Sequence, residues 1–134
     1  MPLHPKQFAV NECWIAFKAT RTPVPIETGL ANIFIVQDAA SMYIFGNTFA
    51  PVEHESPDRG KAALLLRQCW EKKREWPKKL LLPQPISEDN GFVQAAHWNR
   101  IEVQCLPTDE LDLYINDVQS SYEEFLSRDN PGDA

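Results

Sequence analysis

The chain has 134 residues, of which 43% are hydrophobic, and 13 basic and 19 acidic residues give it a formal net charge of −6. This length and composition indicate one globular domain with its own hydrophobic core and exclude a disordered chain. No apolar run approaches the roughly 18 residues of a membrane-spanning helix and no secretory signal is visible, so we expect a cytoplasmic protein without a membrane partner. Cys13, Cys69 and Cys105 lie far apart in the sequence and predict buried free thiols.

The first 29 residues predict an arm, a strand and a loop. Residues 1–8 are expected to form a loose arm. Residues 10–20 predict the first strand, because Cys13, Ile15 and Phe17 alternate with Trp14 and Ala16. Residues 21–29 contain two prolines and a glycine, which is typical of a loop.

A hairpin is expected next. Residues 32–36 form a nearly continuous apolar run and predict a second strand, and residues 42–49 predict a third. The short polar turn at 38–41 favours antiparallel pairing of the two. Gly46 is expected to mark a bulge or bend in the third strand.

A long helix between Ser56 and Pro77 is the strongest pattern in the chain. Ser56 followed by Pro57 predicts an N-cap and a first-turn proline. Basic residues in the last turn suit the negative end of the helix dipole, and Pro77 disfavours helical backbone at the residue before it. The apolar positions at helical spacing are Ala62, Leu65 or Leu66, Cys69 and Trp76.

Three consecutive leucines at 80–82 follow this helix and are bounded by prolines. A short continuous apolar run predicts a strand buried on both faces, which is typical of a central parallel strand. A helix that leads into such a strand is half of a right-handed crossover unit.

The next two elements are predicted to be a short helix and a fifth strand. Residues 91–99 predict the helix, with Ser87 and Asp89 as candidate N-caps. Residues 101–106 predict the strand, which ends before Pro107.

A last helix is predicted to begin at Thr108, which is expected to be its N-cap, with Asp109 and Glu110 in the first turn. Its apolar stripe is Leu111, Ile115, Val118, Tyr122 and Phe125 or Leu126. The tail at 128–134 is polar and is expected to be flexible. The complete order, βββαβαβα, predicts a single α/β (α+β) domain with a mixed five-stranded sheet and helices on both faces.

This order resembles that of the ribonuclease H-like fold, and the local sequence is similar to the integrase and transposase branch of it. Residues 11–17, NECWIAF, resemble the strand that carries the first catalytic aspartate of those enzymes. Residues 36–46, VQDAASMYIFG, resemble their second hairpin, and residues 76–82, WPKKLLL, resemble the segment before their second catalytic aspartate. Residues 92–107 resemble the helix and strand that follow. The chain also resembles uncharacterised bacterial domain families with a WPxxLLL core.

The carboxylates that this resemblance implies are missing. The first catalytic position holds Ala16 or Phe17, and the second holds Pro83 or Gln84. Only an aspartate of the last helix could stand in for the third. Two magnesium ions about 3.5–4 Å apart need three or four converging carboxylates. The sequence therefore predicts no catalytic, cofactor-binding or metal-binding residue and favours a non-catalytic interaction module.

A metal-dependent nuclease with a rearranged carboxylate site is the alternative. Its ligands would be Asp38, Glu53, Asp112 and Asp117. The run Glu53-His54-Glu55 is the one tight cluster of metal-type ligands in the sequence, but adjacent strand residues point to opposite faces. We interpret that run as a solvated connector.

Charge is distributed unevenly along the chain. Residues 56–79 carry eight basic and three acidic residues, so this segment has a charge of +5 and the rest of the chain −11. The basic run could be the solvated end of a helix or a patch for a partner, and the acidic total points away from nucleic acid. The predicted patch is Arg67, Trp70, Lys72, Lys73, Arg74 and Lys78. Its partner would be an unidentified protein, and self-association through a sheet edge is the other mode of interaction.

Overall fold

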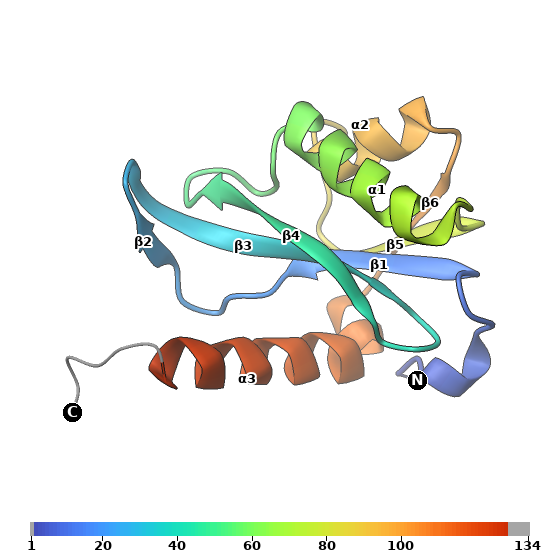
Figure 1. The fold of residues 1–134 in the computed structure, drawn as a ribbon, viewed down its shortest axis with the longest axis horizontal. Coiled ribbons are helices and arrows are strands. Elements are labelled where there is room, and N and C mark those ends of the chain that lie inside the picture. The colour runs from blue at the N-terminus through green and yellow to red at the C-terminus, as the bar shows by residue number, and fades with distance from the viewer. Residues whose placement is uncertain (1, 129–134) are drawn as a thin grey trace.

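The computed structural model describes residues 2–128 (Figure 1). The strands are β1 (Cys13–Lys18), β2 (Val24–Ile26), β3 (Gly29–Asp38), β4 (Ile44–Pro51), β5 (Lys79–Pro83) and β6 (Glu102–Leu106). The helices are α1 (Arg59–Lys73), α2 (Gly91–Trp98) and α3 (Asp112–Arg128), with short 3-10 turns η1 (Pro5–Gln7) and η2 (Thr108–Leu111). None of the helices within residues 2–128 is long and apolar enough to cross a membrane.

The sheet is mixed, as the sequence predicts, but within residues 2–128 it has six strands rather than five. β3 pairs with β4 along one edge and with β1 and then β2 along the other, all antiparallel. β5 pairs in parallel with both β1 and β6, which confirms that the three leucines form an interior parallel strand. The extra strand, β2, lies in the predicted loop, where it forms a tight hairpin with the start of β3.

Helices cover both faces of the sheet, as predicted (Figure 1). The face under α1 and α2 buries Trp14, Leu80 and Leu82 with the apolar positions of those helices. The opposite face buries Ile15 and Leu81 with the apolar stripe of α3. β1 and β5 are therefore apolar on both faces, which explains why they read as continuous hydrophobic runs.

The predicted bulge at Gly46 and the predicted buried free thiols are largely confirmed. The β3–β4 register shifts where Gly46 lies opposite Val36, so the hairpin is irregular at the expected glycine. Cys13 and Cys69 are buried and Cys105 is half-buried, and all three are free. Burial raises the pKa of the Cys69 thiol to about 12.

The predicted helix caps are wrong in each case by a few residues. α1 begins later than Ser56, because the Asp58 carboxylate accepts the Lys61 N–H at 2.8 Å and caps the helix. α2 is capped by Asn90, whose side chain accepts two N–H groups of the first turn. Thr108 lies in η2 and donates its hydroxyl to the Gln84 carbonyl at 2.8 Å instead of capping α3.

The N-terminal arm makes contacts with the rest of the protein. Leu3 donates its backbone N–H to the Glu110 carbonyl at 2.8 Å, and Leu3 and Phe8 pack against the core below the sheet. The N-terminal arm is therefore anchored rather than loose from residue 3 onward. The predicted flexible tail lies outside the described residues, apart from Arg128 at the end of α3.

Candidate functional site

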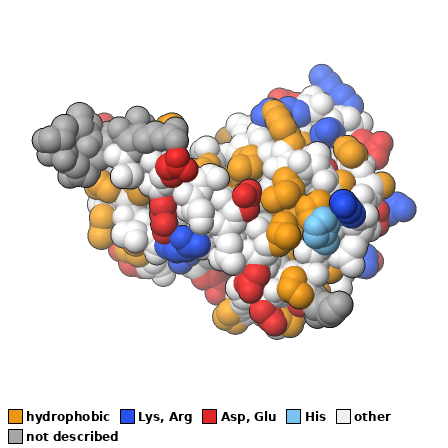
Figure 2. All heavy atoms as spheres, turned by 90° about the horizontal axis from the view of Figure 1, so that it is seen from below, with side chains coloured by type: hydrophobic (Ala, Val, Ile, Leu, Met, Phe, Trp, Pro, Cys, Tyr) orange, Lys and Arg blue, Asp and Glu red, His pale blue; other side chains and the backbone are white. Residues whose placement is uncertain are grey.

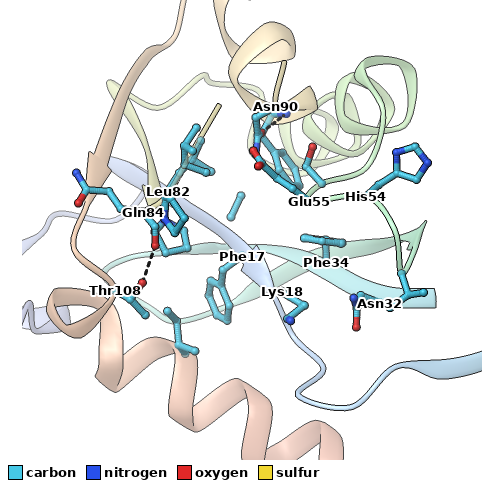
Figure 3. A pocket seen from close by; sticks show the side chains of 18 of the residues that line it. Phe17, Lys18, Asn32, Phe34, His54, Glu55, Leu82, Gln84, Asn90 and Thr108 are labelled. Atoms are coloured by element: carbon cyan, nitrogen blue, oxygen red, sulfur yellow. Dashed lines mark hydrogen bonds between the residues drawn. The ribbon is translucent and has the colours of Figure 1, made fainter. Parts of the chain in front are cut away.

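A pocket of about 570 Å³ lies where the parallel strands β1 and β5 end (Figure 3). In open α/β sheets, ligands bind beyond the carboxyl ends of the strands, because loops rather than helices meet there. Residues of β1, β3, β5, α3 and the loops before α1 and α2 line this pocket. We treat it as the first candidate site.

The base of the pocket is one face of three neighbouring strands. Lys18 pairs with Phe34 across β1 and β3, so their side chains share a face of the sheet. Asn32 lies two residues before Phe34 on β3 and therefore points to the same face. Ala16 and Leu82 complete the base from β1 and β5.

The roof is formed by the loop at 52–56 and the segment before α2, which hydrogen bonds hold together. The Glu55 carboxylate accepts the N–H of Ser87 at 3.1 Å, its hydroxyl at 3.0 Å and the Asn90 amide at 3.3 Å. The bond from the Ser87 backbone N–H is the main cause that holds the pKa of the Glu55 carboxyl below its ordinary value. Ser56 Oγ accepts the Gly91 N–H at 2.9 Å, so the two loops are joined at two points.

Two further hydrogen bonds fix the strand ends at the rim. Gln119 of α3 donates its side-chain amide to the Lys18 carbonyl at 2.9 Å. Thr108 donates to the Gln84 carbonyl, as shown by a dashed line in Figure 3. α3 and η2 are thereby attached to the ends of β1 and β5.

The resemblance predicts two catalytic positions with two alternative residues each, and all four of these residues line this pocket. They are Ala16 and Phe17 on β1 and Pro83 and Gln84 at the end of β5. The α3 residues on the lining are Ile115 and Gln119, whereas Asp112 and Asp117 are exposed and lie off it. The acidic side chains on the lining are Glu53 and Glu55, both from the roof loop.

Residues of the alternative nuclease site do not converge. Asp38 ends β3, whereas Glu53 follows Pro51, which pairs with Ala31 near the start of β3. Seven residues of extended strand, about 23 Å, separate these two ends. The buried Asp38 carboxylate is used locally, since it accepts the N–H of Asn11 and the N–H and hydroxyl of Ser41, all at 2.7 Å.

The part of the chain that the structure describes contains no cluster of metal-type ligands. Within residues 2–128, no three or more His, Cys, Asp or Glu side chains are grouped so that they could hold a metal ion. The predicted connector Glu53-His54-Glu55 is exposed, but it also lines the roof of the pocket.

A second candidate site, the α1-end patch, is the predicted group of Arg67, Trp70, Lys72, Lys73, Arg74 and Lys78. Within it, the Arg67 and Arg74 guanidinium groups lie 5.5 and 5.0 Å from the centre of the Trp70 ring. The ring centre of Trp76 lies 6.1 Å from that of Trp70 and 6.0 Å from that of Trp14. Trp76 also packs against the core. The structure therefore brings two cations and an aromatic side chain together at the surface.

The lysines of the α1-end patch have different surroundings. Lys72 donates to the Phe45 carbonyl and lies 5.7 Å from the Tyr43 ring centre, and Lys73 lies 5.9 Å from the Phe45 ring centre. These two side chains help to cover β4, whereas Lys78 is exposed after the helix. On the face seen in Figure 2, acidic side chains lie at several places and the basic ones lie mainly toward the rim.

Sequence reasoning missed Lys18, Asn32 and Asn90 as pocket residues. The available signal for Lys18 was its place directly after the apolar run of β1, at the carboxyl end of a strand beside a parallel neighbour. Asn32 and Asn90 gave no such signal, because only the β1–β3 register and the fold of the roof bring them to the pocket.

No protein-family model and no curated protein sequence matches this chain. Among solved structures, it is similar to a chain of the simian T-cell lymphotropic virus intasome in complex with PP2A regulatory subunit B56 gamma. The sequence identity is 12%, the TM-score is 0.57, and the match covers 98% of this chain. The chain spans 45% of the length of that intasome chain. This likeness shows a similar fold.

Proposed function

We propose that this protein is a non-catalytic interaction module on a ribonuclease H-like scaffold. The observation that carries the proposal is the lining of the pocket at the ends of β1 and β5, where Phe17 and Pro83 occupy positions that resemble those of catalytic aspartates. Neither side chain can bind a metal ion, and α3 adds Ile115 and Gln119 rather than a carboxylate. Phosphoryl transfer by two metal ions has no ligand set there.

The surface that we propose for the partner is the α1-end patch. Trp and Arg are enriched at the energetic centres of protein interfaces, because they combine a large contact area with directional hydrogen bonding. Arg67, Trp70 and Arg74 form such a group on the exposed side of α1. The local charge of +5 between residues 56 and 79 favours an acidic protein partner.

Self-association through a sheet edge is the other mode of interaction that we propose to test. β2, β4 and β6 each pair with one strand of the sheet, so each has one edge without a strand partner among the described residues. Unpaired strand edges are ready templates for pairing with another chain. The intasome with a similar fold was solved in complex with a regulatory protein subunit, which is compatible with protein binding by this scaffold.

The test compares the wild-type protein with two charge-matched double variants. Arg67→Glu/Lys78→Glu reverses two exposed charges in the patch, and Lys6→Glu/Arg59→Glu reverses two exposed charges outside it. A partner recovered with the wild-type protein is then titrated against all three purified proteins. We expect the patch variant to lose at least tenfold in affinity, or about 1.4 kcal/mol, and the control to lose much less.

Equal binding of all three proteins would reject the patch, and light scattering of the free protein would then test the sheet edges by its oligomeric state. The non-catalytic part of the proposal has its own test. Purified protein is incubated with single- and double-stranded DNA and RNA in Mg²⁺ or Mn²⁺. Cleavage by the wild-type protein that is absent in Glu53→Gln would overturn the non-catalytic part of the proposal.

A further inference from the structure

We propose that the pocket at the ends of β1 and β5 binds a small apolar carboxylic acid, with Lys18 and Asn32 holding its carboxylate. This inference is separate from the α1-end patch. The roof of the pocket lies before the first turn of α1, and the patch lies in its last turns. At 1.5 Å per residue, Arg67 lies about 12 Å and Lys73 about 21 Å beyond Arg59 along the helix.

The side chain of Asn32 gives the first observation that points to a ligand. Its side chain lines the pocket although the residue is only 6% exposed. The Thr20 hydroxyl accepts the Ile33 N–H at 3.1 Å, which leaves its proton free to bond to Asn32 Oδ1 at 3.2 Å. This fixes the carbonyl of the Asn32 amide toward Thr20 and directs its NH₂ group away from it.

Within residues 2–128, that NH₂ group has no protein acceptor, whereas Oδ1 of the same amide is bonded. Its nitrogen is not among the fully buried unpaired atoms of the described residues, so it is open to the space of the pocket. A donor that opens into a pocket and has no protein partner is free to bond to a ligand, as the few polar groups of small-molecule sites do. Figure 3 shows Asn32 beside Lys18 at the base of the pocket. A ligand oxygen between the two side chains would supply the missing acceptor.

Lys18 is the second observation. It is the one lysine or arginine among the described residues that line this pocket. Lys18 is exposed, and no carboxylate of the described residues lies within ion-pair distance of its ammonium group. Asn32 is diagonal to Lys18 across β1 and β3, about 7 Å away at the backbone, so both side chains can reach one carboxylate.

The charges around the pocket favour a single negative charge on the ligand. One ammonium group attracts an anion, but Glu53 and Glu55 lie on the opposite wall and repel a dianion such as phosphate more strongly than a carboxylate. Glu55 is already bonded to Ser87 and Asn90. The wall therefore selects against highly charged ligands without competing for Lys18.

The remaining lining is suited to an apolar group. Phe34, Leu82, Ile86 and Phe92 face the pocket from the sheet, the segment before α2 and α2 itself. A volume of about 570 Å³ lies in the usual range for small-molecule sites, roughly 300–1,000 Å³. Small-molecule sites characteristically combine such apolar walls with a few directed polar groups.

The test is an NMR titration of the ¹⁵N-labelled full chain with three acids, 3-phenylpropionate, benzoate and hexanoate, each at concentrations up to about 10 mM. The carboxamide of the best acid serves as its neutral match. Lys18→Gln is the test variant, and Lys6→Gln, an exposed lysine in η1, is the charge-matched control. Asn32→Ala is a second test variant, and its folding is checked by its spectrum.

We expect at least one acid to cause saturable shifts at Lys18, Phe34 and the Asn32 side-chain amide. Its affinity should fall about tenfold in Lys18→Gln and for the carboxamide with wild-type protein, and should be unchanged in Lys6→Gln. Absence of saturable shifts with all three acids would overturn the proposal. Equal affinity for the acid and its carboxamide, or for wild type and Lys18→Gln, would overturn it as well.

Discussion

Gly91, the first residue of α2, packs against the backbone directly before α1 and is the most sensitive position in the roof of the pocket. A Cβ atom at Gly91 would lie 2.0 Å from the Pro57 carbonyl oxygen and 2.9 Å from the Asp58 carbonyl oxygen. Both are backbone atoms, so the helices must separate to admit a methyl group. The Gly91 N–H bond to Ser56 Oγ would be strained by the same shift.

We predict that Gly91→Ala destabilises the protein by about 3 kcal/mol, the upper end of the usual cost of overpacking. For a chain of this length, that corresponds to a fall in Tm of roughly 10 °C. Urea unfolding followed by tryptophan fluorescence measures the change in the free energy of unfolding. Gly60→Ala is the control, because its Cβ would meet only the Asp58 side chain, at 3.3 Å, and we expect it to stay within about 1 kcal/mol of the wild type.

A Gly91→Ala variant within about 0.5 kcal/mol of the wild type, the size of an ordinary surface substitution, would refute this reasoning. It would mean that the starts of α1 and α2 are further apart than the structure places them. The roof of the pocket would then have a different shape.

Three further predictions concern the cap, the core and the roof. Arg100 follows α2 with φ 59° and the Ile101 N–H bonded to Ala96, so Arg100→Gly should raise the free energy of unfolding by about 0.5–1 kcal/mol in urea titrations. Burial, with the Asp38 charge adding to it, raises the pKa of Tyr114 to about 12. The unfolded chain therefore loses this proton first, so stability should fall from about pH 10 to 12, and less so in Tyr114→Phe. The pKa of Glu55 is lowered rather than raised, so its effect on the stability has the opposite dependence on pH. Its contribution is present above the ordinary pKa of glutamate and is lost as the pH falls through the folded pKa, so thermal melts of Glu55→Gln and wild type should converge in acid.

Elements that depend on local sequence were predictable. The leucine run of β5 required only its own apolar residues and the flanking prolines to identify an interior strand, and Gly46 marked the irregular hairpin. β2 was missed because three residues around Pro25 carry little strand signal of their own. They pair because the chain turns back onto β3, which a local pattern does not contain.

Caps and site residues depend on contacts between distant segments. Ser56 and Asp58 are both good capping residues, and the sequence cannot show that Ser56 bonds to Gly91 across 35 positions, which leaves Asp58 to cap α1. In the sequence, Asn32 resembles any other strand residue. Only the β1–β3 register, which pairs Lys18 with Phe34, shows that Asn32 is diagonal to Lys18. The residues that stand where the resemblance predicts carboxylates, such as Phe17 and Pro83, can be read from the sequence, whereas the donors Lys18 and Asn32 at the same place cannot.

α1 connects the two candidate sites and allows them to be separated experimentally. The backbone directly before it packs against the start of α2 in the roof of the pocket, whereas Arg67 and Trp70 lie in its second half and Arg74 follows its last residue. A separation of the helices in Gly91→Ala should therefore weaken binding of an acid in the pocket and leave partner binding at the α1-end patch intact in the folded protein. Arg67→Glu should do the reverse. Loss of both activities in both variants would show that the pocket and the patch belong to one extended site.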